Sequence, residues 1–444
     1  MNLVKTIRQR KGITESLSNI GWRSGGTIVR LLGGAVVGIV VARYLGPRQF
    51  GLLNFALAIY SLFNIVSNLG MDSLVVRDVV LDQSNEHEVL GTAFVLKAAA
   101  SVVTAITATF VEWLMEPHNG ILIAIVALMS FASISQALDV VDYFFQAKVR
   151  SRYTVVPRTI VFVAASVARL VAVYLHMSLL AFAWIAALEV FFSEIGLGFS
   201  YLCYRRTLPR WNWHLPRAKS LLSESWPLLI SSIMIVLYMR TDQLLLGKLS
   251  TMSTVGVYSV AVRLSEIWYA IPIIVTGTVM PRLLQSRDLN SAKYQSRLLI
   301  FYESMILVSL FVVAGTLLAG PFVIKLLYGQ QFAPASKILS IHIWTGVFVA
   351  VGCIGGQQYV HEKITISSVQ RTALGAVVNV VLNFLWIPHW GGMGSAMATL
   401  VAQSIGSYFG DAFDYRTRHI FRMKTRAYLQ FWTLPFQVWQ EVRK

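Results

Sequence analysis

The stretch that decides the fold covers residues 19–44 and reads NIGWRSGGTIVRLLGGAVVGIVVARY. It is apolar enough and long enough to cross the ~30 Å hydrocarbon core of a bilayer as one helix. A short connection follows, and similar stretches recur about twelve times along the 444 residues. We predict spans at 19–44, 50–76, 89–113, 120–145, 156–176, 178–203, 222–247, 254–281, 296–319, 336–359, 365–387 and 392–413. The pattern predicts an all-α integral membrane protein.

Composition excludes most other classes. A mean hydropathy of +0.61 and 13% charged residues rule out a soluble globular protein. Cys203 and Cys353 both fall inside predicted spans, so we expect no disulfide framework. The eight His lack metal-ligand spacing, no phosphate-binding loop occurs, and no nucleophile is paired with a base. We therefore expect neither an enzyme nor a cofactor. The polar first fifteen residues predict that no cleavable signal is present.

The basic residues predict the orientation. Of the 38 Lys and Arg, 26 fall in every second connection and the two termini, and five fall in the other connections. By the positive-inside rule both termini should be cytoplasmic. The net charge of +17 then indicates contact with anionic membrane lipids rather than with nucleic acid.

Ordered pairs of like residues indicate an internal repeat. Gly51 and Gly256 lie 205 positions apart, and Arg158-Thr159 and Arg371-Thr372 lie 213 apart. An even number of spans per repeat keeps both copies in the same orientation. We expect a six-helix N-terminal lobe, a basic linker, a six-helix C-terminal lobe and an amphipathic basic cytoplasmic tail on the inner leaflet, at 1–204, 205–220, 221–415 and 416–444.

Three motifs occur in order along the chain: ARYLGPRQFG at 42–51, DQLLLG at 242–247, and the run from Asn383 to Gly394. With them, the chain resembles the Wzx-type polysaccharide flippases, which share a superfamily with lipid II flippases and MATE multidrug exporters. The resemblance implies a MATE-like fold. It also implies transfer of an undecaprenyl-pyrophosphate-linked oligosaccharide to the outer leaflet of the bacterial cytoplasmic (inner) membrane, for surface polysaccharide such as the O-antigen of lipopolysaccharide. A polysaccharide polymerase and a chain-length regulator would be partners.

Charges inside the spans are the candidate substrate contacts, because an Arg at mid-bilayer costs at least ~2.5–3.5 kcal/mol. Arg23 and Arg30 lie two helical turns apart on one face, about 10 Å from each other. In the superfamily fold, spans one, two, seven and eight line the central cleft. The resemblance thus implies a cationic cavity that binds pyrophosphate through guanidinium groups. The candidates are Arg30, Arg23, Arg263, Arg240 and Arg169.

Local ion pairs are the alternative role for two of these arginines. Arg263 lies three residues from Glu266, and Arg240 lies two residues from Asp242. We also expect a structural pair between Lys97 and Glu189, in spans three and six.

Acidic residues and one helix-end Arg are candidates for coupling or gating. Glu266 lies on a predicted central helix, where burial should favour proton uptake, but whether proton, sodium or nothing drives transport stays open. The coupling or gating candidates are Glu266, Asp242, Asp72, Arg77 and Asp139.

Two other functions compete. A MATE-like cation-coupled multidrug antiporter shares the fold, but its cleft should be acidic rather than rich in Arg. A membrane polysaccharide polymerase or ligase would need a sizeable aqueous loop, and the predicted connections are short.

Overall fold

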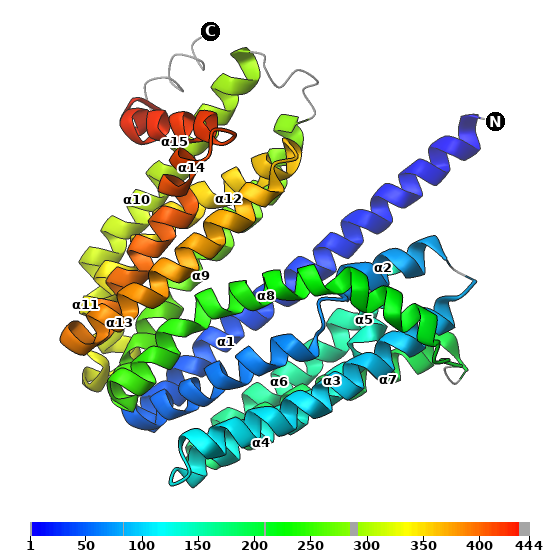
Figure 1. Cartoon of the computed structure of the whole chain (residues 1–444), viewed down its shortest axis with the longest axis horizontal. Helices are drawn as coiled ribbons and strands as arrows, with labels where there is room; N and C mark the ends of the chain where they lie inside the picture. Colours follow the sequence, from blue (N-terminus) through cyan, green and yellow to red (C-terminus); the bar gives the residue numbers. More distant parts are fainter. Residues whose placement is uncertain (1, 83, 208–209, 285–291, 435–444) are drawn as a thin grey trace. The chain divides into compact units, whose positions relative to one another are not determined.

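The computed structural model of the chain describes residues 2–82, 84–207, 210–284 and 292–434, with side chains from residue 19 onward except those of 20, 23, 282 and 365. Within these ranges the chain is helical and contains no strand (Figure 1). In the first half the helices are α1 (Asn2–Ser67), α2 (Asp72–Leu81), α3 (Glu86–Met115), α4 (Gly120–Ala132), α5 (Val140–Ala147), α6 (Arg152–Tyr174), α7 (Leu179–Arg205) and α8 (Leu215–Leu249). In the second half they are α9 (Met252–Leu284), α10 (Ala292–Tyr328), α11 (Ala335–His342), α12 (Thr345–His361), α13 (Thr365–Ser404), α14 (Gly410–Phe413) and α15 (Arg418–Gln430).

The helices form two compact units. The N-terminal unit contains residues 1–45 and 55–236, and the C-terminal unit contains residues 46–54 and 237–444. Helices α1 and α8 therefore each contribute to both units. The predicted lobe boundaries, with a linker at 205–220, stay a prediction.

Ten segments of the described residues are long and apolar enough to cross a membrane. Two are too long for one crossing, Ser24–Leu81 and Ile366–Phe413, and each contains a glycine with non-helical backbone angles. Gly46 has φ 71° and ψ 172°, and Gly391 has φ 54° and ψ −129°. Both glycines fall at predicted boundaries between spans. The total of twelve spans stays a prediction.

Several predicted spans differ from the observed helices, among them the tenth, which is divided into α11 and α12. The second ends early, because Leu69 and Gly70 take positive φ and separate α1 from α2. The fourth contains a 3₁₀ segment, η1 (Ser133–Asp139), where Ser133 donates to the Ser130 carbonyl at 2.6 Å. The ninth is longer than predicted: α10 continues through Pro321 to Tyr328, so the connection between the ninth and tenth spans is shorter than the span bounds predict.

The repeated glycines contact each other within the C-terminal unit. A Cβ on Gly51 would lie 1.7 Å from the Met252 carbonyl oxygen and 2.8 Å from the Gly256 nitrogen. A Cβ on Gly256 would lie 2.0 Å from the Pro47 carbonyl oxygen. Only glycine permits so close an approach of two helix backbones.

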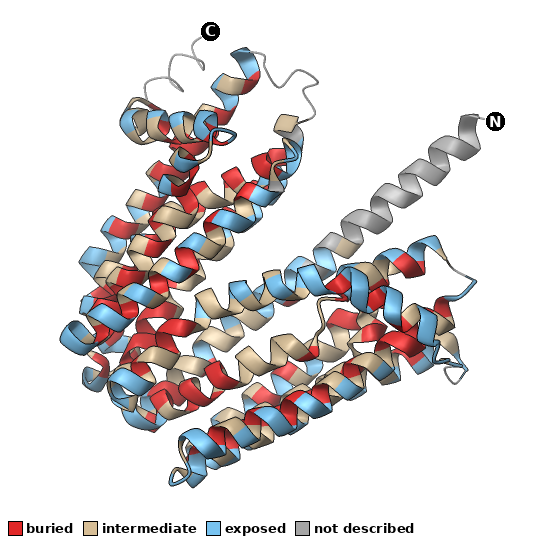
Figure 2. Cartoon of the chain, viewed as in Figure 1, coloured by how far each residue is buried: buried red, intermediate tan, exposed pale blue. Residues whose placement is uncertain are grey.

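Burial follows the inner faces of the helices in each unit, while large apolar side chains remain exposed on the outer faces (Figure 2). Phe199 on α7 is 67% exposed and Leu318 on α10 is 85% exposed. Such surfaces suit hydrocarbon rather than water. The core of the C-terminal unit also includes Ala427, so the helix α15 packs into that unit.

Candidate functional site

The N-terminal unit contains a network of charged side chains centred on Arg158. Arg158 belongs to α6, and its Nη2 lies 2.5 Å from Asp139 Oδ1 of η1 and 3.1 Å from Glu194 Oε1 of α7. Its Nη1 lies 3.5 Å from Asp142 Oδ2 of α5. The 3₁₀ segment before α5 positions both aspartates beside α6. One guanidinium thus joins four helical segments.

The network continues through Lys97 of α3, whose side chain is 2% exposed. Lys97 Nζ lies 3.2 Å from Asp139 Oδ2 and donates to Tyr143 Oη and Asn68 Oδ1, each at 2.9 Å. Tyr143 in turn donates to Asp72 Oδ1 at 2.6 Å. Two predicted gating residues, Asp72 and Asp139, are therefore linked through Tyr143 and Lys97.

A polar pocket of about 240 Å³ opens beside this network and contains Arg30 of α1. It is lined by Thr27, Arg30, Asp142, Gln146, Ser151, Thr154, Val155 and Arg158. Arg158 and Asp142 already pair with each other. Among the residues that the structure describes, none forms a hydrogen bond or ion pair with Arg30. Arg30 therefore places a guanidinium without such a partner in this pocket, where the charges of Asp142 and Arg158 act on it.

The other predicted arginine contacts are distributed over both units. The side chain of Arg23 lies outside the described residues. Arg169 pairs with Glu189 at 2.5 Å within the N-terminal unit. The prediction of a Lys97–Glu189 pair is therefore wrong, because Lys97 pairs with Asp139 and Glu189 pairs with Arg169.

Arg240, Arg263 and Glu266 belong to the C-terminal unit and are half-buried. The charges of Arg240 and Arg263 both act on Glu266. Whether these arginines share a cavity with Arg30 stays a prediction.

Asp242 of α8 is 5% exposed. Its hydrogen-bond partners are neutral side chains, whereas the alternative interpretation of the sequence was an ion pair with Arg240. It accepts hydrogen bonds from Asn383 Nδ2 at 2.7 Å, Tyr258 Oη at 2.5 Å and Thr399 Oγ1 at 2.5 Å. The region also contains buried polar atoms that have no hydrogen-bond partner among the described residues: both side-chain polar atoms of Asn379, Asn383 Oδ1 and Ser395 Oγ. A buried carboxylate with spare oxygen ligands nearby is a site that a small cation or a proton could occupy.

Arg77, the remaining gating candidate, lies on α2 and pairs with Asp78 and Glu224, each at 2.8 Å. It makes a surface contact between α2 and α8, while Asp72 bonds to Tyr143 and Asn68.

A second ion cluster lies in the C-terminal unit around Asp411 of α14, which is fully buried. Arg371 Nη1 lies 2.9 Å from Asp411 Oδ1, and Lys424 Nζ lies 2.7 Å from Asp411 Oδ2. Tyr359 donates to Asp411 at 2.7 Å. Lys424 comes from the tail helix α15, outside the candidate spans. Burial lowers the pKa of Lys424 to about 8, while the carboxylate of Asp411 opposes that shift.

Sequence reasoning did not find this cluster. In the sequence, the Arg371-Thr372 pair is visible only as a match to Arg158-Thr159, and the basic tail predicts contact with lipid. One signal was available: Arg158 and Arg371 are repeated, and Glu194 and Asp411 occupy the following spanning segments.

Comparison with known proteins identifies the family. Residues 16–287 match the family described as "Polysaccharide biosynthesis protein". The chain is 25% identical over 181 residues to "Probable flippase AglR" of Haloferax volcanii, a match that covers 38% of this chain and 36% of that protein. The aligned part therefore spans little more than a third of that relative's length.

Solved structures share the fold. The structure entitled "Lipid II flippase MurJ, inward closed conformation" matches with a TM-score of 0.71 at 12% identity, covering 93% of this chain and 92% of that one. An inward-facing multidrug resistance MATE family transporter of the MOP superfamily matches with a TM-score of 0.63 at 15% identity, covering 88% and 96%. These proteins are flippases and transporters rather than enzymes. With a family match over more than half its length and this fold, the chain is a multi-pass membrane protein that belongs to the polysaccharide biosynthesis protein family.

Proposed function

We propose that this protein flips an undecaprenyl-pyrophosphate-linked oligosaccharide from the cytoplasmic to the outer leaflet of a bacterial cytoplasmic membrane. The observation that carries the proposal is Arg30, a guanidinium on a membrane-spanning helix that faces a polar pocket without a partner among the described residues. Such a charge is costly unless a ligand or water compensates it. The family match and the flippase names of the relatives agree with this role.

The chemistry of the pocket suits a pyrophosphate group. Arg30 can form two parallel hydrogen bonds to one phosphate, and Thr27, Ser151 and Thr154 lie around it. Asp142 would repel the anion, but its pairing with Arg158 offsets that charge. The predicted orientation places this pocket toward the cytoplasmic side, where the substrate must load. The sugars would then cross by alternating access between inward and outward states, while the lipid chain stays in the bilayer.

Coupling is a separate proposal, and Asp242 is its strongest candidate. The Asp242 carboxylate is buried and accepts hydrogen bonds from neutral donors, one of them Asn383. Side-chain oxygens of Asn379, Asn383 and Ser395 have no hydrogen-bond partner among the described residues. A proton or a sodium ion that binds there would neutralise the Asp242 carboxylate, and this ion would be the one that is transported together with the substrate. In reconstituted vesicles, flipping by the Asp242→Asn variant should no longer depend on the ion gradient. Flipping by the Glu266→Gln variant should still depend on it. The reverse result would assign coupling to Glu266.

Arg30 tests the main proposal. In vesicles reconstituted with a lipid-linked oligosaccharide, Arg30→Ala should lose flipping while retaining the folded protein, because the half-buried Arg30 side chain lines a pocket. Arg30→Lys should recover part of the activity, since it keeps the charge but loses the two-pronged geometry. Arg30→Asp should be inactive. Arg48→Ala, which removes an exposed charge, is the matched control. Normal flipping by Arg30→Asp at equal protein level would contradict the proposal.

A MATE-like multidrug antiporter is the alternative that the fold supports. The same vesicles distinguish the two functions: an antiporter should move cationic dyes and leave lipid-linked oligosaccharide in its original leaflet. The predicted partnership with a polymerase and a chain-length regulator stays a prediction.

A further inference from the structure

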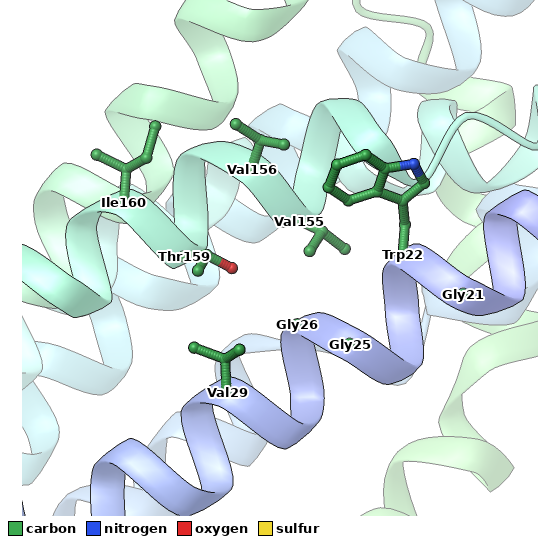
Figure 3. Close-up of a pocket in the computed structure, with 9 residues that line it drawn as sticks. All are labelled: Gly21, Trp22, Gly25, Gly26, Val29, Val155, Val156, Thr159 and Ile160. Atoms are coloured by element: carbon green, nitrogen blue, oxygen red, sulfur yellow. The ribbon is translucent and has the colours of Figure 1, made fainter.

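An apolar groove of about 560 Å³ lies between α1 and α6 in the N-terminal unit (Figure 3). It is lined by Gly21, Trp22, Gly25, Gly26, Val29, Val155, Val156, Thr159 and Ile160. In Figure 3, Trp22 lies beside Val155 at one end, while Val29, Thr159 and Ile160 border the remainder. Thr159 supplies the one side-chain hydroxyl, so the groove suits a hydrocarbon chain.

The groove is open to the surroundings of the protein. Trp22 is 42% exposed, Val29 45% and Ile160 63%. Gly21 and Gly25 have no heavy atom within 4 Å of where a Cβ would be, so their missing side chains leave the groove wide. At the depth of a spanning helix, these exposed walls would face lipid.

The groove adjoins the polar pocket of Arg30. Val155 lines both cavities, and each helix alternates between them: Gly26 and Thr27 on α1, and Arg158 and Thr159 on α6. Gly26 marks the contact between the helices, since a Cβ there would lie 2.4 Å from Val155 Cγ1. An apolar groove and a cationic side chain thus lie on neighbouring faces of one helix pair.

We propose that this groove holds the polyprenyl chain of the lipid whose pyrophosphate binds Arg30. The inference rests on the proposed function and adds a site for the hydrocarbon part of the substrate. An amphiphile with a phosphate head and a long chain of isoprene units matches both surfaces, with the head beside Arg30 and the chain along Val29 and Ile160. The Gly26–Val155 contact forms the boundary between the two parts.

Photo-crosslinking tests the site directly. A photoreactive residue replaces Ile160 in the full chain, reconstituted in bilayers with a polyprenyl pyrophosphate that carries a chemical tag on its chain. Crosslinking should be strong and should fall when unlabelled polyprenyl pyrophosphate is added. A photoreactive residue at Val167, 54% exposed on the same helix but outside the groove, is the control and should not show this competition. Equal competition by a phosphatidylglycerol would mean that bulk lipid fills the groove and would overturn the proposal.

Filling the groove tests its role in transport. Gly25→Leu adds a side chain where open space allows one, and should abolish both the competed crosslink and flipping. Gly315→Leu places the same side chain at an equally open glycine of α10 and should leave both unchanged. Wild-type flipping by Gly25→Leu would overturn the groove site while leaving the flippase proposal intact. Absence of flipping by the unmutated protein would instead refute the proposed function, whatever the crosslinking shows.

Discussion

Arg158 in the N-terminal unit and Arg371 in the C-terminal unit occupy matching positions of the predicted internal repeat, yet their surroundings differ. Each precedes a Thr near the start of a spanning segment, and each pairs with an acid of the following one, Glu194 at 3.1 Å and Asp411 at 2.9 Å. Arg158 has two further acidic partners and is 24% exposed beside the Arg30 pocket. The Arg371 side chain is 8% exposed and packs against the Tyr359 ring, and its partner Asp411 also binds Lys424 of the tail helix α15.

The difference lies in what completes each pair. In the N-terminal unit the additional charges come from neighbouring spanning segments, and a pocket remains open. In the C-terminal unit Lys424 enters from the tail, and the cluster is closed to solvent. The missing side chain of Gly355 makes room for it, since a Cβ there would lie 2.7 Å from Lys424 Nζ. The matching ion pairs therefore differ in setting: one borders a candidate binding pocket, and the other joins the helix α15 to its unit.

We expect the largest effect when one acidic side chain is removed from each cluster and the two losses in the free energy of unfolding are compared. Asp411→Asn leaves Arg371 and Lys424 buried without a counter-charge, which should cost about 3–5 kcal/mol of the free energy of unfolding. Glu194→Gln should cost less, because Arg158 retains Asp139 and Asp142. Thermal unfolding of the two purified variants in one detergent measures this. Equal losses would mean that the two clusters are energetically alike.

The anchoring role of Lys424 predicts an intermediate effect that is confined to the tail. Lys424→Glu places a second negative charge beside Asp411, so α15 should detach and residues 418–430 should exchange their amide hydrogens faster. Arg422→Glu makes the same charge change on the exposed face of α15 and should leave that exchange nearly unchanged. If both variants exchange alike, net charge rather than the buried contact holds the tail.

The smallest expected effect is a pH dependence of tail attachment. His419 Nε2 lies 2.8 Å from Glu362 Oε2, and this carboxylate raises the pKa of His419 above its ordinary value of 6.5. The attached tail thus binds the proton more tightly than the detached tail does. The contribution of the His419–Glu362 pair to tail attachment should be fully present below pH 6.5. It should be lost as the pH rises through the raised pKa of His419. Hydrogen exchange of 418–430 at about pH 6 and about pH 8, corrected for intrinsic rates, measures it. His419→Gln should remove the dependence; an unchanged dependence would assign it to another group.

The helical membrane fold follows from the sequence because a spanning segment is a local property. Some twenty apolar residues identify it without knowledge of its neighbours. The breaks were less visible: Leu69 is an ordinary apolar residue in sequence, yet its positive φ helps to end a helix inside a predicted span.

The charge pairs could not be predicted in the same way, since they depend on which helices meet. The sequence predicts a pair between Lys97 and Glu189, but the packing of α3 against η1 brings Lys97 to Asp139 instead. Arg30 was identified from its own helix, because the absence of an acid within a turn is visible in the sequence. Lys424 could not be identified, since a basic amphipathic tail looks the same whether one of its lysines is buried or all lie on lipid.

The contact between Gly51 and Gly256 constrains how the chain can evolve. If the two halves descend from a duplicated gene, these glycines are copies of one ancestral residue, and each now limits the space of the other. A mutation that enlarges either copy meets a backbone rather than a side chain, so no compensating change at the partner position can relieve it. Sequences of relatives should therefore retain glycine at both positions together, even where the charged residues of the two halves have diverged.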